Sequence, residues 1–381
     1  MNNSSKKKFD IIVLGSGIAG ISIASELSEY LNVCVLEKER LISYHSTGRS
    51  LAFYLESYGN EVIRQLTSAS KDFFYNRIDT TSKNILIKKR GVIHIANKFQ
   101  TIKLKNLYET LTKNNENFKI LNKLQTMELL PCLNDEYVDS SIYDSEASDI
   151  DVNAVYNIYL KKLTKNNGKV ITDIKITEFL HQDHGWKILT NQDEFQTKII
   201  VNAAGAWCDR IATNVGAQNI NIVPKKRTVF CFKPTNIKLQ NDWPLAVDVE
   251  ESFYFKIENE TVIASPADET PMSPQDAQPD ELDIAIGIER IKNSTKFQFN
   301  SITNKWAGLR SFVDDKTPVI GFDKNINNFY WFAGQGGFGI QTSPVLAKIA
   351  SNMILGKDNG YFEKEFQIDL NFLDVKRFKS I

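Results

Sequence analysis

The hydrophobic pattern near the start of the chain alternates between strands and a helix. Residues 9–14 (FDIIVL) form a short apolar run typical of a buried strand. The glycine-rich segment 15–20 (GSGIAG) follows, then an amphipathic stretch to about Tyr30, and a second strand-like run at 32–36 that ends at Glu37. This order of strand, glycine turn, helix, strand and acid predicts a dinucleotide-binding βαβ unit rather than a chance cluster of glycines.

The glycines of this turn have separate physical roles. Gly15 permits the tight turn, Gly17 lets the backbone approach a pyrophosphate, and Gly20 lets the helix pack closely against the strand. Amides at the helix N-terminus face the phosphates with partial positive charge. Glu37 is placed to accept hydrogen bonds from a ribose hydroxyl, and an acid there disfavours a 2′-phosphate. The sequence therefore predicts NAD or FAD before NADP.

The middle of the chain contains further strand-like segments outside this βαβ unit. Strand-like segments at 169–176 and 185–190 precede a nearly apolar run at 198–201, which leads into the small residues of 202–207 (NAAGAW). Small residues after a buried strand allow a ligand to sit close to the backbone. Plain sheet packing explains them equally well, so both interpretations stay open.

Alternation of apolar and polar residues predicts a second, antiparallel sheet. The short alternating runs are 228–233, 251–257 and 260–264. Residues 265–280 then contain several prolines among acids and polar residues, which predicts an irregular surface loop. Such a loop can also serve as a lid over a site, and that alternative stays open.

A second strand, glycine loop and helix lie near the C-terminus. Residues 328–333 form the strand and 334–339 (GQGGFG) the loop. Pro344 fits the first turn of the following helix, with Thr342 or Ser343 at its N-cap. We expect both ends of the chain to bind one long cofactor.

Composition narrows the class of protein. The 381 residues are 42% hydrophobic and 24% charged, as in globular proteins, and 46 basic residues balance 46 acidic ones. No basic surplus points to a nucleic-acid partner. The 4 cysteines show neither a Cys-x-x-Cys pair nor zinc spacing, so no metal site is predicted. Without a transmembrane run or a secretory signal, we expect a cytoplasmic protein, with peripheral attachment at the inner membrane left open.

Motifs spread over most of the chain carry a family resemblance. They are 15–20 with Glu37, 44–50 (YHSTGRS), 201–209 (VNAAGAWCD), 224–227 (PKKR), 251–254 (ESFY), 306–313 (WAGLRSFV) and 333–343 (AGQGGFGIQTS). With them the chain resembles the FAD-dependent amino acid oxidoreductase family of the D-amino acid oxidase and glycine oxidase type, and within it the bacterial D-arginine dehydrogenase-like branch. The first glycine motif is shared by many nucleotide-binding folds, whereas 44–50 and 333–343 are more specific.

The resemblance implies an α/β fold of two interleaved domains. A doubly wound, Rossmann-type FAD-binding domain would comprise 8–80, 145–218 and 305–375. An α+β substrate domain built on an antiparallel sheet would comprise 81–144 and 219–304.

The resemblance also implies a non-covalent FAD, in agreement with the lack of cysteines in the loops expected near the flavin. The cofactor-binding residues it implies, together with those of the first glycine turn, are Gly15, Gly17, Ile18, Ala19, Gly20, Glu37, Lys38, His45, Ser46, Thr47, Gly48, Arg49, Ser50, Ala203, Gly205, Trp207, Arg310, Gly336, Gly337, Phe338, Gly339, Ile340, Gln341 and Thr342. For His45, cofactor contact or plain loop structure is favoured over a role as a base.

Substrate oxidation requires a second set of residues. Oxidising an amine to an imine moves a hydride equivalent from Cα to flavin N5, and the substrate carboxylate needs a cation, for which a guanidinium fork is well matched. The residues that the resemblance implies here are Arg310, Arg227, Tyr254, Tyr58, Gly337 and Gln341. Structural salt bridges are the alternative role for the arginines, and core packing is the alternative for the tyrosines.

Departures from the D-arginine-specific pattern bear on the substrate. Phe53 and Leu55 stand where relatives carry polar residues, and 89–92 (KRGV) stands near an expected acid. A cationic side chain would meet no counter-charge. The prediction is a D-amino acid dehydrogenase for apolar or aromatic side chains, which yields a 2-imino acid and then a 2-oxo acid and ammonia. Its electron acceptor, a quinone, redox protein or oxygen, is unidentified.

Two alternatives to this activity stay open. One is an oxygen-using oxidase of glycine, N-methyl amino acids or 2-hydroxy acids. The other is a flavin-binding module without turnover.

Overall fold

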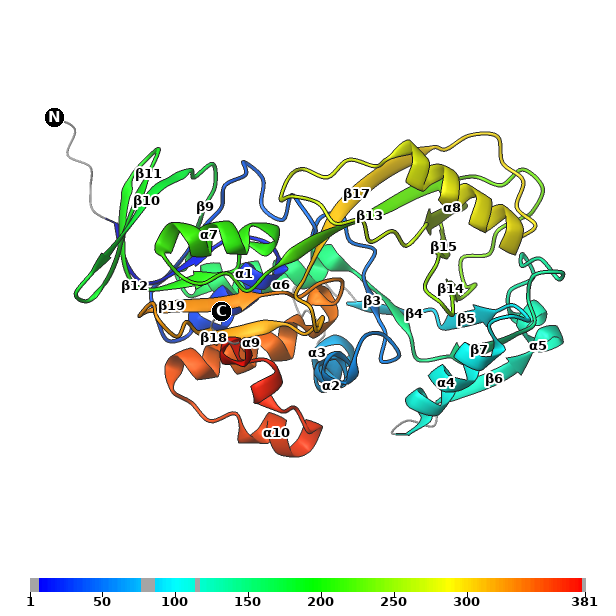
Figure 1. Cartoon of the computed structure of the whole chain (residues 1–381), viewed down its shortest axis with the longest axis horizontal. Coiled ribbons are helices and arrows are strands. Elements are labelled where there is room, and N and C mark those ends of the chain that lie inside the picture. Colours follow the sequence, from blue (N-terminus) through cyan, green and yellow to red (C-terminus); the bar gives the residue numbers. More distant parts are fainter. Residues whose placement is uncertain (1–6, 77–85, 114–116, 379–381) are drawn as a thin grey trace.

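The computed structural model describes residues 7–76, 86–113 and 117–378 (Figure 1). Its sheets and helices form the mixed α/β architecture that the sequence predicts. The boundary expected between residues 80 and 81 lies outside the described residues, and the proposed domain limits as a whole stay predictions.

A mainly parallel sheet is built around β1 (Lys7–Leu14). That strand lies between β2 (Val33–Leu36) and β12 (Glu194–Asn202), with β9 (Lys169–Ile171) beyond β2 and β19 (Phe329–Ala333) beyond β12. These five strands run parallel, so their carboxyl ends meet at one edge. The predicted βαβ unit and the C-terminal strand thus share one sheet although they lie far apart in the chain.

Both faces of this sheet are buried. Ile11 of β1 contributes to one core, under α1 (Ile18–Leu27) and α9 (Gly339–Leu355), whereas Ile12 contributes to another, under α7 (Cys208–Val215). Successive strand side chains point to opposite faces, so a strand covered on both faces has a continuous apolar sequence.

Antiparallel strands extend the sheet on the side of β12, whereas β9 is its other edge. They are β18 (Val319–Phe322), β10 (Ile176–Gln182) and β11 (Gly185–Thr190). The single strand expected at 169–176 is wrong, because β9 pairs with β2 and β10 with β11. Asp173 adopts the left-handed conformation (φ 60°) between them, which ends the extended strand.

An eight-stranded sheet confirms the predicted antiparallel segment. Its order is β17 (Asn304–Phe312), β13 (Val223–Phe232), β16 (Thr261–Ser265), β15 (Tyr254–Glu258), β14 (Leu245–Asp248), β5 (Val92–Ala96), β7 (Ser140–Asp144) and β6 (Phe118–Asn122). Only the β14–β5 pair is parallel. Helix α8 (Glu281–Ser294) packs on it through Ile284 and Ile291. Figure 1 shows the two sheets toward opposite ends of the long axis, with β13 and β17 reaching between them.

The remaining described elements are short or peripheral. Helix α6 (Val152–Lys165) packs with α1, and a small sheet consists of β3 (Phe53–Tyr54), β8 (Ser148–Ile150) and β4 (Ile87–Lys89). The other helices are α2 (Glu61–Ala69), α3 (Lys71–Tyr75), α4 (Thr101–Thr112), α5 (Lys123–Leu129) and α10 (Gly360–Phe366). Three 3₁₀ turns comprise Gly205–Trp207, Leu370–Phe372 and Val375–Arg377. Of the predicted loop 265–280, Ser265 is the last residue of β16, and 266–280 form no helix or strand of their own.

Helix α9 begins earlier than the sequence predicts. Its first residue is Gly339, so neither Thr342 nor Ser343 is the N-cap, and Pro344 lies inside the helix. A proline there has no N–H for the carbonyl four residues earlier, which is that of Ile340. The Ser343 hydroxyl donates to the Ile340 carbonyl instead, at 2.9 Å, and this bond removes the usual penalty of an unpaired carbonyl.

Candidate functional site

The turn between β1 and α1 has no room for side chains at Gly15 and Gly20. Gly15 has φ +99°, and a Cβ on it would lie 2.7 Å from the Ala203 carbonyl oxygen. A Cβ on Gly20 would lie 1.8 Å from the Gly15 oxygen. Thr47 accepts the Ile18 N–H at 2.9 Å and so joins segment 44–50 to the start of the helix.

Glu37 holds this turn from the end of β2. One carboxylate oxygen accepts both the N–H and the hydroxyl of Ser16, each at 2.7 Å, and the other accepts the Glu39 N–H at 2.9 Å. The carboxylate therefore braces the turn and still faces the cavity beside it. The proposed bond to a ribose hydroxyl would add to these contacts.

A cavity of about 430 Å³, called here the sheet-edge cavity, opens at the carboxyl ends of β1, β2 and β12. Ligands of open α/β sheets bind at this edge. Fourteen of the residues predicted for the cofactor line it: Gly15, Gly17, Ile18, Ala19, Glu37, Lys38, His45, Ser46, Thr47, Ala203, Gly205, Trp207, Gly336 and Gly339. Segments from both ends and the middle of the chain thus meet around one space.

His45 lines the sheet-edge cavity beside Trp207 and Glu39. Its ring is 4.7 Å from the Trp207 ring, and its Nε2 is 3.1 Å from a Glu39 carboxylate oxygen. It lines the sheet-edge cavity and not the adjoining one described below. This position fits the predicted cofactor contact better than proton transfer to a substrate.

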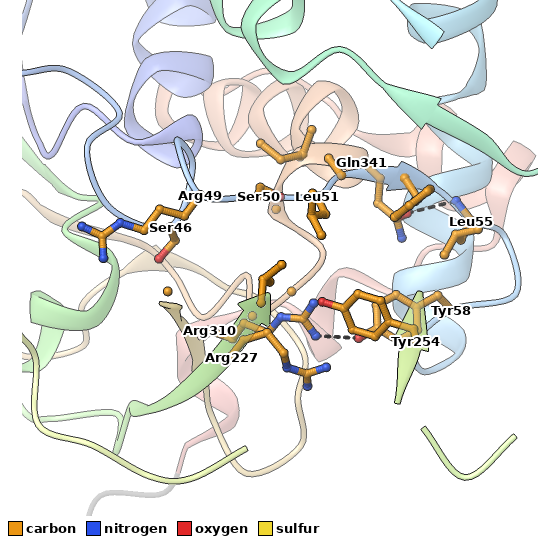
Figure 2. A pocket seen from close by; sticks show the side chains of 18 of the residues that line it. Ser46, Arg49, Ser50, Leu51, Leu55, Tyr58, Arg227, Tyr254, Arg310 and Gln341 are labelled. Carbon is orange, nitrogen blue, oxygen red and sulfur yellow. Dashed lines mark hydrogen bonds between the residues drawn. The ribbon is translucent and has the colours of Figure 1, made fainter. Parts of the chain in front are cut away.

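A second cavity of about 160 Å³, called here the arginine cavity, adjoins the first (Figure 2). Arg227, Arg310, Tyr58, Tyr254 and Gln341 line it. The residues that line both cavities are Ile18, Ser46, Thr47, Leu309, Gly336 and Gly339. The two cavities therefore share part of their walls. Gly337, Ile340, Arg49 and Ser50, also predicted, line the arginine cavity.

Arg310 presents its guanidinium to the arginine cavity. Its Nη1 donates to the Tyr58 hydroxyl at 2.9 Å, and Figure 2 shows Tyr58 and Tyr254 beside it. It pairs with no carboxylate among the described residues. Burial lowers the pKa of Arg310, but the two phenols and Glu269 raise that pKa by more, so the group stays charged. A Cβ on Gly337 would lie 2.9 Å from the guanidinium carbon, so the lack of a side chain at Gly337 leaves space for the Arg310 guanidinium.

Arg227 is the more buried of the two arginines. Its Nη2 donates to a Glu269 carboxylate oxygen at 3.2 Å. Its Nε is buried and has no hydrogen-bond partner within the described parts of the chain. An unsatisfied buried donor on a cavity wall is costly, and a ligand that accepted its proton would relieve the cost.

Gln341 has both ends of its amide occupied by protein. The oxygen accepts the Leu55 N–H at 3.1 Å, and the nitrogen donates to the Thr67 hydroxyl at 3.0 Å. These bonds tie α9 to α2 and to the cavity wall at Leu55. The geometry favours a positioning role for Gln341 over direct contact with the reacting atoms.

Four residues predicted for the cofactor, Gly20, Gly48, Phe338 and Thr342, stand behind the walls of both cavities. Phe338 packs on Tyr58 with ring centroids 4.8 Å apart. A Cβ on Gly48 would lie 2.6 Å from the Ser43 oxygen. These contacts support the walls, and the predicted roles of the four in cofactor binding stay predictions.

Loop 266–280 is anchored over the site. The Arg49 guanidinium donates to the carbonyls of Ala277 (3.0 Å) and Ala307 (2.9 Å) and pairs with Asp276. Ala267 of the same loop lines the arginine cavity. The loop thus forms part of the wall, while the lid alternative stays open.

Sequence reasoning missed several polar residues of the walls, among them Arg210, His94 and Glu251. Arg210 lines the sheet-edge cavity, and His94 and Glu251 line the arginine cavity. His94 is hidden in the sequence by an apolar strand, and burial lowers its pKa to about 4. Glu251 belongs to the recognised segment 251–254 but received no role. The expectation of a pocket without any acid is wrong, because the turn before β15 places the exposed Glu251 at the arginine cavity.

Comparison with known proteins identifies the class. Residues 10–353 match the family model described as FAD dependent oxidoreductase, and the chain belongs to this family. A glycerol 3-phosphate dehydrogenase of Caloramator mitchellensis is 25% identical over 232 residues, which are 60% of this chain and 48% of that protein. The chain therefore spans about half the length of that relative.

Two solved structures share the fold. Glycine oxidase from Geobacillus kaustophilus superposes with a TM-score of 0.84 at 15% identity, covering 98% of this chain and 100% of that one. A dithionite-reduced L-α-glycerophosphate oxidase from Mycoplasma pneumoniae with FAD bound superposes with a TM-score of 0.80 at 18% identity, covering 92% and 95%. The chain is thus an FAD-dependent oxidoreductase, while the D-arginine dehydrogenase-like branch is not shown.

The two cavities suit FAD. Gly15 and Gly20 allow no side chains at the start of α1, and the N-cap residue Gly17 has no side chain, so phosphates can approach this helix N-terminus closely. None of the cysteines, all within the described residues, lines either cavity. Within the described residues there is also no cluster of metal-ligating side chains and no helix long and apolar enough to cross a membrane.

Proposed function

We propose that this protein catalyses the oxidative deamination of D-amino acids with apolar or aromatic side chains, using non-covalent FAD. The observation that carries the proposal is Arg310, a charged guanidinium without a carboxylate partner among the described residues, in a cavity that adjoins the proposed cofactor cavity. A buried cation without a counter-ion is costly unless a ligand supplies one. The carboxylate of an amino acid matches its donors.

Each wall of the arginine cavity has a task in this proposal. Arg310 holds the substrate carboxylate, Tyr58 fixes the guanidinium, and the Tyr254 hydroxyl faces the same group. The apolar side chains Leu51, Phe53, Leu55, Leu245 and Val247 surround the substrate side chain. FAD, when bound, accepts the hydride equivalent from Cα. The resulting 2-imino acid hydrolyses to a 2-oxo acid and ammonia.

The start of α9 has a separate task. Helix N-termini favour negative charge by about 0.3–1 kcal/mol when exposed and up to about 2 kcal/mol when partly buried. No side chain caps α9 among the described residues, and the preceding turn has Gly336 at φ +53°. The amides of Gly336, Phe338 and Thr342 already donate to the carbonyls of Ser311, Gln335 and Phe338. We propose that the remaining amides of 336–342 stabilise negative charge on the cofactor. The electron acceptor, a quinone, a redox protein or oxygen, stays unassigned.

Anaerobic bleaching of the flavin tests the proposal directly. Purified holoenzyme is mixed with a panel of D- and L-amino acids, glycine, sarcosine and 2-hydroxy acids. We expect bleaching and a higher kcat/KM with D-methionine, D-leucine or D-phenylalanine than with D-arginine or D-lysine. Preference for the cationic substrates would contradict the apolar pocket and point to Glu251, and bleaching by none of the panel would favour a binding module. Peroxide release in air distinguishes an oxidase from a dehydrogenase.

Replacement of Arg310 tests the carboxylate role. Arg310→Ala should raise KM at least about tenfold, since a charged hydrogen bond contributes about 1.5–3 kcal/mol, while bound FAD is retained. Arg310→Lys keeps the positive charge but lacks the paired N–H donors of a guanidinium, and its KM should lie between those of wild type and Arg310→Ala. An unchanged KM in Arg310→Ala would remove Arg310 from this role.

A phosphorylated alcohol is the second candidate substrate. It is favoured by two guanidinium groups on one cavity, Arg227 and Arg310, and by the family relative named for glycerol 3-phosphate. Glycerol 3-phosphate in the same anaerobic panel separates the candidates.

A further inference from the structure

A single carboxylate occupies a cluster of cations beside the arginine cavity. Glu269, from loop 266–280, lies 3.0 Å from Lys225 Nζ, 3.2 Å from Arg227 Nη2 and 3.5 Å from Lys316 Nζ. Burial raises the pKa of Glu269, but these cations lower it by more, so the group stays ionised. The protein thus supplies its own anion to three positive side chains.

Of these cations, only Arg227 lines the arginine cavity. Its side chain is 9% exposed, against 23% for Lys225 and 51% for Lys316, so Glu269 joins the cavity wall to the protein surface. Arg227 uses Nη2 for Glu269 and leaves a buried Nε without a partner in the described structure. Arg310, in contrast, has no carboxylate partner among the described residues.

We infer that Glu269 is a specificity-determining residue: its carboxylate, behind the cavity wall, neutralises the Arg227 guanidinium that a second anionic group of a ligand would otherwise bind, and so restricts the site to substrates with one anionic group. This inference rests on the proposed function, in which Arg310 binds that one carboxylate. A second carboxylate on the substrate would have to displace Glu269 from Arg227 or lie beside it against like-charge repulsion. Substrates with neutral side chains avoid both costs.

The substitution Glu269→Gln tests the inference because it removes the charge and nearly preserves the shape. The probes are two analogues without an amino group, 4-methylpentanoate for leucine and glutarate for glutamate. Their dissociation constants are measured from the change that each produces in the flavin absorption of the holoenzyme. We expect wild type to bind 4-methylpentanoate more tightly, and Glu269→Gln to improve glutarate binding at least about tenfold relative to 4-methylpentanoate.

Glu251→Gln is the matched control, because it removes an acid that lines the cavity itself but frees no guanidinium. If it improves relative glutarate binding as much as Glu269→Gln does, the effect is one of general charge and the inference is overturned. An unchanged ratio in a Glu269→Gln protein that retains its flavin overturns it as well.

Arg227→Met completes a double-mutant cycle. In the wild-type background it should leave the ratio of the two dissociation constants within about twofold, since Glu269 already neutralises Arg227; in the Glu269→Gln background it should remove most of the gain. A gain that survives without Arg227 contradicts the inference. Should Glu269→Gln not fold, a large change in the ratio in Arg227→Met alone would contradict it, and an unchanged ratio would support it.

Turnover separates this inference from the proposed function. With D-leucine and D-glutamate as substrates, Glu269→Gln should improve the relative kcat/KM of D-glutamate chiefly through KM. If no amino acid reduces the flavin, the proposed function fails, but the binding ratio of the two analogues still reports on Glu269.

Discussion

At Gly337 a hydrogen atom in place of a side chain makes room for the Arg310 guanidinium. We predict that Gly337→Ala moves Arg310 and raises KM for the amino acid substrate at least about tenfold, because its Cβ would lie 2.9 Å from the guanidinium carbon. Flavin content should change little. Gly308→Ala, also on this cavity, is the control, since its Cβ would meet nothing closer than 3.7 Å. Equal KM values in both variants would contradict the prediction.

His94 makes the stability of the fold depend on pH. Burial lowers its pKa to about 4 from 6.5, so between these values the unfolded chain binds a proton that the folded chain does not. This difference in proton binding has no effect on stability above pH 6.5, and at pH 5 it lowers the free energy of unfolding by about 2 kcal/mol. His94→Gln should therefore lose less stability than wild type between pH 7 and pH 5, as measured by thermal unfolding.

Asp144 provides a comparison of opposite sign. Burial raises its pKa to about 6 from 3.8, so the folded chain binds the extra proton in that range and gains stability as pH falls. Asp144→Asn should lose more stability than wild type over the same interval. If both variants differ from wild type in the same direction, one of the two assignments is contradicted.

At the scale of elements, the two glycines of the first turn should respond differently to alanine. Gly20→Ala drives a Cβ to 1.8 Å from the Gly15 oxygen, so α1 has to move away from β1 and the melting temperature should fall sharply. Gly17→Ala meets only the Thr47 hydroxyl, at 3.4 Å, and should leave the fold intact but weaken FAD binding. Melting temperature and flavin content, measured together, check both outcomes.

Element types were predictable where the local pattern is strong, and element ends were less so. The strands around Ile12 and the helix after Gly17 follow from sequence because both are specified by residues close in the chain. The start of α9 could not be predicted from the sequence. A proline inside a helix is tolerated only where another group bonds the carbonyl that it leaves free, and here the Ser343 hydroxyl bonds the carbonyl of Ile340. The break at Asp173 had no clear sequence signal either.

At the scale of the whole molecule, FAD should be part of the stability of the fold. The sheet-edge cavity is walled by strands and helices from both ends and the middle of the chain, so a bound cofactor joins them. A ligand at 100 times its Kd adds about 2.7 kcal/mol. Removal of FAD should lower the melting temperature by a few degrees, and added FAD should restore it.

NAD is the control for that experiment, because an acid at Glu37 suits either dinucleotide. NAD added to the protein from which FAD has been removed should leave the melting temperature unchanged. The adjoining arginine cavity offers no specific partner for the nicotinamide half of NAD. Stabilisation by NAD equal to that by FAD would contradict the assignment of the arginine cavity to the flavin end.

The sequence by itself determined the parallel βαβ unit and the antiparallel sheet, and most of the site residues predicted from it line the two cavities. Those features depend on local periodicity, on glycines in tight turns and on a motif pattern shared with a family. Only the tertiary structure decided that Arg310 has no carboxylate partner among the described residues while Arg227 is held by Glu269. Both are arginines on neighbouring strands, and their difference depends on where a loop some forty residues away along the chain places one acid.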